Sequence, residues 1–104
     1  MNLLYICKKN LHRSYTAEHV IGREFPRVEV QSAGILENVV TEEQMRWADI
    51  VFVMEPWHQE ELEKMFPNLE KRIVCLDIPD EYPRFNPELV RLLKERTRPY
   101  VEGL

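Results

Sequence analysis

LLYICKKNLHRS, residues 3–14, is the stretch that decides the fold of this chain. The apolar run at residues 2–7 is short and gives way to polar residues, which is typical of a buried strand. Apolar residues then recur at helical spacing, at Ala17, Val20, Ile21 and Phe25, before Pro26 ends the pattern. The sequence therefore predicts a strand, a polar loop and a helix in direct succession.

Three further strands are predicted downstream. Residues 28–30 alternate with period two, and Ser32-Ala33-Gly34 is expected to close that strand. Residues 50–54, IVFVM, form a continuous apolar run, which indicates a strand that is buried on both faces. Residues 72–76 form the fourth predicted strand, and Cys75 is expected to behave there as a small buried hydrophobe.

Helices are predicted between these strands and after the last one. Thr41 and Gln44 have the spacing of a capping box, which would open a short helix. A second helix is expected from Pro56 to near Pro67. Asn86-Pro87-Glu88 is a well-formed N-terminal cap for the last helix, which follows a proline-rich loop at residues 77–85.

Alternation of four strands with four helices predicts an α/β fold in a single domain, residues 1–104. We expect a four-stranded parallel sheet of order 2-1-3-4 with helices on both faces, which is a Rossmann-like or flavodoxin-like arrangement. Ligands of such sheets bind beyond the carboxyl ends of the strands, where the strand order reverses. Cys7 is predicted to lie at that place.

Composition excludes several classes of protein. Hydrophobic residues make up 44% of the 104 residues and charged residues 31%, as in an ordinary globular domain. The formal net charge of −4 argues against sequence-independent nucleic-acid binding. No membrane span and no targeting segment are apparent, and two widely separated cysteines form neither a disulfide framework nor a metal site. We therefore expect a cytoplasmic protein without membrane association.

The loop at residues 7–14 has the components of a phosphate site. A thiol acts as a nucleophile only as the thiolate, which a helix N-terminus and the nearby Arg13 would stabilise. The residues between Cys7 and Arg13 can turn successive N–H groups inward around a tetrahedral anion, and the guanidinium can grip two of its oxygens. Ser14 can donate its hydroxyl to the sulfur. This combination favours attack on phosphorus through a phosphocysteine intermediate, which requires no metal or other cofactor.

CKKNLHRS followed by Tyr15-Thr16-Ala17-Glu18 resembles the active-site loop of the low-molecular-weight protein tyrosine phosphatases, whose pattern is C-x4-C-R-S-P with a following Ala-Glu pair. Three later stretches resemble this family in the same order. They are VQSAG at residues 30–34, ADIVFVME at residues 48–55 and Asp80-Glu81-Tyr82, which is similar to the family's Asp-Pro-Tyr loop. The resemblance covers nearly the whole chain.

The resemblance implies a role for each matching residue. It makes Cys7 the nucleophile, Arg13 the phosphate-binding residue and Asp80 the general acid, with Ser14 stabilising the thiolate. The phosphate-binding loop would comprise Cys7, Lys8, Lys9, Asn10, Leu11, His12, Arg13 and Ser14. Asn10 stands where the family has an asparagine that helps to hold the loop, and asparagine also tolerates a left-handed backbone. Asp77 lies on the same loop as Asp80 and is the alternative acid, although it also suits a turn.

This sequence departs from the family pattern at several positions. Lys9 replaces the usual glycine, His12 replaces the second cysteine, and Tyr15 and Glu81 stand where proline is usual. The chain is also shorter than the usual member, and the missing length falls between Gly34 and Thr41. Trp47, Trp57, Tyr15 and Tyr82 are candidates for pocket walls, whereas His19 and His58 are expected at the surface or in helix packing.

Three functions fit these features. The first is a cysteine-dependent phosphatase that acts on a phosphorylated protein or a small phosphomonoester. The second is a non-catalytic module that binds phosphoproteins or phosphate, which the shortened chain and the lost glycine would allow. The third is an arsenate reductase, which needs further cysteines, and Cys75 is the remaining one. The sequence leaves the physiological substrate and the oligomeric state open.

Overall fold

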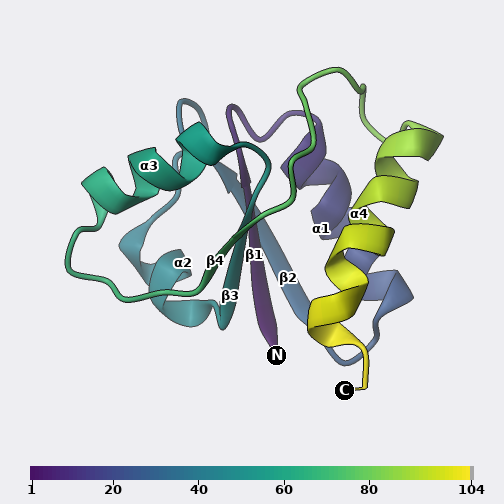
Figure 1. The fold of residues 1–104 in the computed structure, drawn as a ribbon, viewed down its shortest axis with the longest axis horizontal. Coiled ribbons are helices and arrows are strands. Elements are labelled where there is room, and N and C mark those ends of the chain that lie inside the picture. Colours follow the sequence, from purple (N-terminus) through teal and green to yellow (C-terminus); the bar gives the residue numbers. More distant parts are fainter. Residues whose placement is uncertain (104) are drawn as a thin grey trace.

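A computed structural model describes residues 1–103. Four strands and four helices alternate along the chain (Figure 1). The strands are β1 (Asn2–Cys7), β2 (Glu29–Gly34), β3 (Ile50–Val53) and β4 (Ile73–Cys75). The helices are α1 (Arg13–Glu24), α2 (Glu42–Trp47), α3 (Pro56–Met65) and α4 (Pro87–Val101). Within the described residues, no helix has both the length and the apolar character that a membrane crossing requires.

The strands form one parallel sheet of order β2-β1-β3-β4, as predicted. Helices α1 and α4 cover one face of this sheet, and α2 and α3 cover the other (Figure 1). The strand order reverses at β1, because β2 lies on one side of it and β3 on the other. Cys7 is the last residue of β1, so it lies at the carboxyl edge of the sheet at this switch point.

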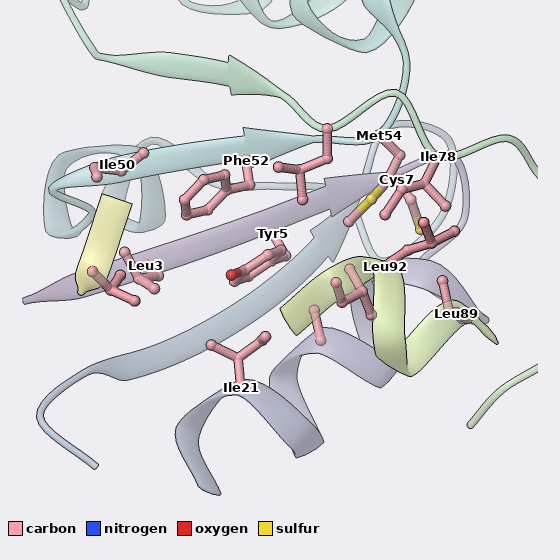
Figure 2. Close-up of a cluster of buried hydrophobic side chains, with 14 of the residues drawn as sticks. Leu3, Tyr5, Cys7, Ile21, Ile50, Phe52, Met54, Ile78, Leu89 and Leu92 are labelled. Atoms are coloured by element: carbon pink, nitrogen blue, oxygen red, sulfur yellow. The ribbon is translucent and has the colours of Figure 1, made fainter. Parts of the chain in front are cut away.

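Two hydrophobic cores result from the alternation of side chains along β1. Leu3, Tyr5 and Cys7 point to the face covered by α1 and α4, while Leu4 and Ile6 point to the opposite face. Figure 2 shows the first of these cores, with Cys7 at the end of β1. The Tyr5 ring stacks on that of Phe52 at 4.9 Å between centroids. Burial on both faces explains why β1 is apolar from Leu3 onward.

The end of strand β2 differs from the prediction. Ser32-Ala33-Gly34 was expected to close the strand, but β2 continues through these residues because Ala33 pairs with Ile6 and Gly34 pairs with Cys7. A Cβ atom at Gly34 would lie 2.1 Å from the carbonyl oxygen of Glu37. Glycine therefore serves here to let the following turn approach the strand, and it does not interrupt the pairing.

Both predicted caps are confirmed. Thr41 Oγ1 accepts the Gln44 N–H and Gln44 Oε1 accepts the Thr41 N–H, so the capping box is complete. Asn86 Oδ1 accepts the N–H groups of Glu88 and Leu89 at the start of α4.

The prediction that Cys75 is a buried hydrophobe was wrong, because β4 is an edge strand and all three of its residues are half-buried.

Candidate active site

A cleft of about 230 Å³ opens at the carboxyl edge of the sheet, where β1 passes into α1. It is lined by Cys7, Lys8, Lys9, Leu11, His12, Arg13 and Asp80. Six of these residues belong to the loop predicted to bind phosphate, and Asp80 comes from the loop between β4 and α4. The fold thus brings the three predicted catalytic side chains to one opening.

Cys7 lies in the floor of this cleft with 3% of its surface exposed. Its Sγ atom is 3.0 Å from Oγ of Ser14, which is fully buried in the first turn of α1. Asn10 Nδ2 donates to the same Oγ atom at 2.8 Å. Because the Asn10 amide supplies that hydrogen, the hydroxyl hydrogen of Ser14 is left for Cys7 Sγ or for the Ala33 carbonyl at 3.3 Å.

Asn10 holds the loop from within. Its φ angle of 57° is left-handed, a conformation that asparagine tolerates better than most residues. Its Nδ2 atom also donates to Ser32 Oγ at 2.9 Å, and its Oδ1 atom accepts from Nδ2 of Asn38. Asn38 belongs to the turn between β2 and α2. This is the segment in which the chain is shorter than the usual family member. Nothing local in the sequence distinguishes Asn38 from an ordinary turn residue.

The same turn supports the backbone of the loop. The N–H groups of Ile35 and Leu36 both donate to the Lys8 carbonyl, at 3.0 and 2.8 Å. Lys9 Nζ lies 3.9 Å from a carboxylate oxygen of Glu37. The Leu11 carbonyl accepts a hydrogen bond from Arg84 Nε. The Cys7 carbonyl also accepts the Ile35 N–H at 3.0 Å, so three loop carbonyls are engaged by neighbouring segments.

Unlike these carbonyls, the backbone N–H groups that follow Cys7 in the loop have no hydrogen-bond partner among the described residues. Within residues 1–103, the backbone N–H groups of residues 8–15 donate no hydrogen bond to another residue, and the first to do so is that of Thr16. Polar backbone groups are seldom left without a partner, so consecutive free donors beside a helix N-terminus are typical of an anion site. The predicted phosphate cradle is consistent with this geometry.

Arg13 also lines the cleft, although only 1% of its surface is exposed. Its Nη1 atom donates to Glu55 Oε2 at 2.7 Å and to the Ile78 carbonyl at 2.8 Å. Its Nη2 atom lies 3.9 Å from Asp80 Oδ1. Sequence reasoning missed Glu55, although an acidic residue just beyond β3, at the same edge as Cys7, was a usable signal.

The structure separates the two candidate acids. Asp80 lines the cleft, and its side chain is half exposed. Asp77 lies outside it, with a left-handed φ of 54° and with Oδ1 3.4 Å from Sγ of Cys75. Arg96 Nη1 donates to the Asp77 carbonyl at 2.8 Å. Asp77 therefore lies beside α4, and of the two acids only Asp80 is in place to act on a ligand of the cleft.

The loop that carries Asp80 is fastened at its far end. Arg84 contacts the Leu11 carbonyl, and its guanidinium lies 4.0 Å above the centre of the Tyr15 ring. The Phe85 N–H donates to Thr16 Oγ1 at 3.2 Å. These contacts join the loop that carries Asp80 to the loop at residues 7–14 and to α1.

None of the four aromatic residues named as candidates for pocket walls lines the cleft. Trp47 and Trp57 pack against the core under α2 and α3. Tyr82 lines an adjoining hollow together with His12 and Asp80. Tyr15 packs with His19 and Phe85 on the outer side of α1. The wall of the cleft is instead formed by lysine, histidine and leucine side chains of the loop.

His58 is fully buried at the start of α3 and is more than a packing residue. Its Nδ1 atom accepts the N–H groups of Met54 and Glu55 at 3.2 and 3.1 Å. Its Nε2 atom has no hydrogen-bond partner and lies 3.7 Å from Glu55 Oε2. Burial, assisted by the charge of Arg13, lowers the pKa of His58 to about 4, so its ring is neutral near pH 7.

The charge in the cleft comes from side chains and backbone of the protein. Among residues 1–103, no group of three or more histidine, cysteine, aspartate or glutamate side chains is placed to hold a metal ion. The positive charge available to an anion in the cleft comes from Arg13 and the lysines of the loop. The free N–H groups of the loop add their partial charges to it.

Comparison with known proteins gives matches of structure only. No protein-family model matches the sequence, and no curated protein sequence matches it. The tyrosine phosphatase Wzb from Escherichia coli K30, in complex with phosphate, aligns over 99% of this chain and 97% of its own, with TM-score 0.81 and 22% identity. A low-molecular-weight phosphotyrosine phosphatase from Vibrio cholerae O395 aligns over 99% and 95%, with TM-score 0.84 and 18% identity.

An arginine phosphatase is also among the similar structures. YwlE, in a variant with a phosphorylated active-site serine, aligns over 99% of this chain and 97% of its own, with TM-score 0.79 and 20% identity. All three matches extend over almost the full length of both chains. The predicted resemblance is thus confirmed in three dimensions, and the chain has the fold of the low-molecular-weight tyrosine phosphatases.

Proposed function

We propose that the protein is a metal-independent phosphomonoester hydrolase that works through a phosphocysteine intermediate on Cys7. The observation that carries the proposal is the convergence of Cys7, Arg13 and Asp80 on one small cleft. The cleft sits where consecutive backbone N–H groups have no partner within the described chain. A nucleophile, an anion cradle and an acid are the three parts that phosphoryl transfer through a thiolate requires.

Binding is the task of the loop. The N–H groups of residues 8–15 and the guanidinium of Arg13 would donate to the non-bridging oxygens of the phosphoryl group. This arrangement sets the phosphorus against the Cys7 sulfur. As the transition state forms, charge on the equatorial oxygens meets donors that are already fixed in place. Arg13 and the backbone thereby supply the electrostatic stabilisation.

In the first step, the thiolate of Cys7 attacks phosphorus and an S–P bond forms. The P–O bond to the leaving group breaks, and the protonated carboxyl of Asp80 gives its proton to the departing oxygen. The Ser14 hydroxyl, 3.0 Å from Sγ, stabilises the thiolate before attack. The products are a phosphocysteine and a free alcohol or phenol.

In the second step, water attacks the phosphocysteine. Asp80, now a carboxylate, accepts a proton from the water as its oxygen bonds to phosphorus. The S–P bond breaks, inorganic phosphate forms, and the Cys7 thiolate returns with the Ser14 hydroxyl beside it. The cycle consumes one water for each phosphomonoester and leaves the protein unchanged.

The structural neighbours support this chemistry. Wzb and the Vibrio cholerae protein are tyrosine phosphatases, and YwlE is an arginine phosphatase. In the YwlE variant, a serine that replaces a cysteine in the active site is phosphorylated. For this chain we propose a phosphorylated protein or a small phosphomonoester as the substrate.

A hydrolysis screen tests the proposal. Aryl phosphates, phosphopeptides, sugar phosphates and nucleotides are incubated with the protein, and released phosphate is measured, with Cys7→Ser as the blank. We expect release from at least one class with the wild-type protein and none with the variant. Tight binding of a phosphopeptide without release of phosphate would instead identify a non-catalytic binding module. Release at the wild-type rate by Cys7→Ser would contradict the proposed mechanism.

A further inference from the structure

The hydrogen bonds of Arg13 are distributed unevenly over its guanidinium. Nη1 carries two hydrogens, and both have acceptors, Glu55 Oε2 at 2.7 Å and the Ile78 carbonyl at 2.8 Å. Nε and Nη2 donate no hydrogen bond to any residue within 1–103, and the nearest acid, Asp80, is 3.9 Å from Nη2. One edge of the guanidinium is therefore fixed to the protein, and the other edge is free.

The free edge is the one suited to a phosphoryl group. Nε and Nη2 present parallel N–H bonds, which match two oxygens of a phosphate in a bidentate contact. Rotation of the guanidinium would exchange this edge for another and lose the match. The acceptors on Nη1 consequently decide how Arg13 meets its ligand.

Glu55 is held in turn by its own helix. It precedes α3 as the N-cap residue, and its backbone N–H, like that of Met54, donates to Nδ1 of the buried His58. Because Nδ1 accepts these hydrogens, the ring proton of neutral His58 resides on Nε2. That atom has no hydrogen-bond partner and lies 3.7 Å from the same Glu55 oxygen that Arg13 contacts. The buried Nε2–H dipole of His58 therefore stabilises the Glu55 carboxylate in the position that contacts Arg13.

We propose that Glu55, oriented by His58, is the positioning residue that presents the Nε–Nη2 edge of Arg13 to the phosphoryl group. The inference about turnover rests on the proposed function. The inference about anion binding does not, because it concerns only how the guanidinium is aimed.

Charge neutralisation is the competing explanation for Glu55. A buried arginine needs a counter-charge, and Glu55 would serve that purpose without any effect on orientation. The two explanations differ in the sign of a measurable effect. If Glu55 only neutralised charge, its replacement by glutamine would remove a negative charge near the anion site and tighten phosphate binding. If Glu55 positions Arg13, the same change weakens phosphate binding.

The experiment compares Glu55→Gln and Glu55→Asp with Glu60→Gln as the matched control. Glu55→Gln keeps the length of the side chain without its charge, and Glu55→Asp keeps the charge but is shorter by one methylene. Glu60→Gln makes the same charge change at an exposed position of α3. Dissociation constants for inorganic phosphate are measured by titration calorimetry, and kcat and KM are measured with p-nitrophenyl phosphate. Circular dichroism spectra and thermal unfolding verify that each variant is folded.

We expect the phosphate dissociation constant to rise about tenfold in both Glu55 variants and kcat/KM to fall by at least about tenfold, with Glu60→Gln unchanged. Tighter or unaltered phosphate binding by Glu55→Gln would overturn the proposal. So would wild-type binding by Glu55→Asp, because that variant retains the charge and alters only the reach.

His58 is tested with His58→Asn. The asparagine Oδ1 atom can accept the two backbone N–H groups that Nδ1 accepts, but no group then reaches Glu55. We expect the phosphate dissociation constant to rise about threefold to tenfold in the folded variant. An unchanged constant would show that Glu55 is held without His58.

Failure of this inference is distinguishable from failure of the proposed function. If the wild type binds phosphate in a Glu55-dependent manner but hydrolyses no phosphomonoester, the proposed function is wrong and the positioning of Arg13 stands. If the wild type hydrolyses p-nitrophenyl phosphate and both Glu55 variants match it in binding and turnover, the positioning is wrong and the proposed function stands.

Discussion

The Sγ atom of Cys7 lies 3.0 Å from the Oγ atom of Ser14, and Asn10 donates to that same oxygen. The contact joins the last residue of β1 to the first turn of α1, so the sulfur is fixed by both elements that flank the phosphate loop. Since the amide of Asn10 already supplies one hydrogen, the serine hydroxyl is free to donate to the sulfur. A donor in this place stabilises the thiolate.

Ser14→Ala tests that contact. A hydrogen bond to a charged group contributes about 1.5–3 kcal/mol, so we expect the thiolate to react with iodoacetamide at least about tenfold more slowly at pH 6 and kcat to fall comparably. Ser32→Ala is the matched control, because Ser32 also accepts from Asn10 but makes no hydrogen bond with Cys7. Equal alkylation rates for Ser14→Ala and the wild type would contradict this role of the hydroxyl.

Asp80→Asn tests the general acid, with Asp77→Asn as its control on the same loop. Only Asp80 lines the cleft, whereas Asp77 lies against Cys75 and α4. We expect Asp80→Asn to lower kcat by about 10²–10⁴-fold for alkyl phosphates and less for p-nitrophenyl phosphate, whose leaving group needs little protonation. Asp77→Asn should remain near the wild-type rate. A larger loss of kcat in Asp77→Asn than in Asp80→Asn would reverse the assignment.

Gly34→Ala tests the support of the phosphate loop by the turn between β2 and α2. An added Cβ would lie 2.1 Å from the Glu37 carbonyl oxygen and 3.1 Å from the backbone of both Asn10 and Lys8. We expect a loss of about 3 kcal/mol or more in the free energy of unfolding, measured by urea denaturation.

Gly22→Ala is the control, because apart from the adjoining residues and backbone of α1 itself no atom lies within 4 Å of the added Cβ. Alanine in a helix interior should stabilise the protein by roughly 0.5–1 kcal/mol. If the two substitutions changed the free energy of unfolding by similar amounts, close packing at Gly34 would not be what requires glycine there.

The pH dependence of stability tests the buried His58. The pKa of His58 falls from 6.5 in the unfolded chain to about 4 in the folded protein, mainly because burial disfavours the charged ring. The unfolded state therefore binds a proton first, and the contribution of His58 is complete above pH 6.5 and is lost as the pH falls through about 4.

The contribution of His58 to the free energy of unfolding should fall by about 3 kcal/mol between pH 7 and pH 4. His58→Gln removes the titrating ring, so the difference in unfolding free energy between wild type and variant should shrink over this window. Urea denaturation at intervals of pH measures that difference. A difference that stays constant from pH 7 to pH 4 would show that His58 does not titrate with folding.

Local signals were sufficient to predict most of the fold. The strand, loop and helix at residues 2–24 follow one another without a break, and the caps at Thr41 and Asn86 depend on residues three or fewer positions apart. The end of β2 was mispredicted because Gly34 is locally a turn signal. Its pairing with Cys7 depends on tertiary register instead.

The site was predictable only in part for the same reason. The phosphate loop is one contiguous motif, whereas the contact of Arg13 with Glu55 spans 42 residues and that of Asn10 with Asn38 spans 28. Such pairs are determined by the arrangement of β1, β3 and the turn after β2, which no local pattern records. The choice between Asp77 and Asp80 likewise depended on which side of the loop each carboxyl occupies.

Trapping of the intermediate tests the central claim most directly. The protein is mixed with p-nitrophenyl phosphate, quenched with acid within milliseconds to seconds, digested and analysed by mass spectrometry. The mechanism predicts one phosphoryl group on the peptide that contains Cys7, a matching burst of p-nitrophenol, and neither signal in Cys7→Ala. Steady release of phosphate with an unmodified Cys7 peptide and no burst, or a wild-type rate in Cys7→Ala, would contradict catalysis through phosphocysteine.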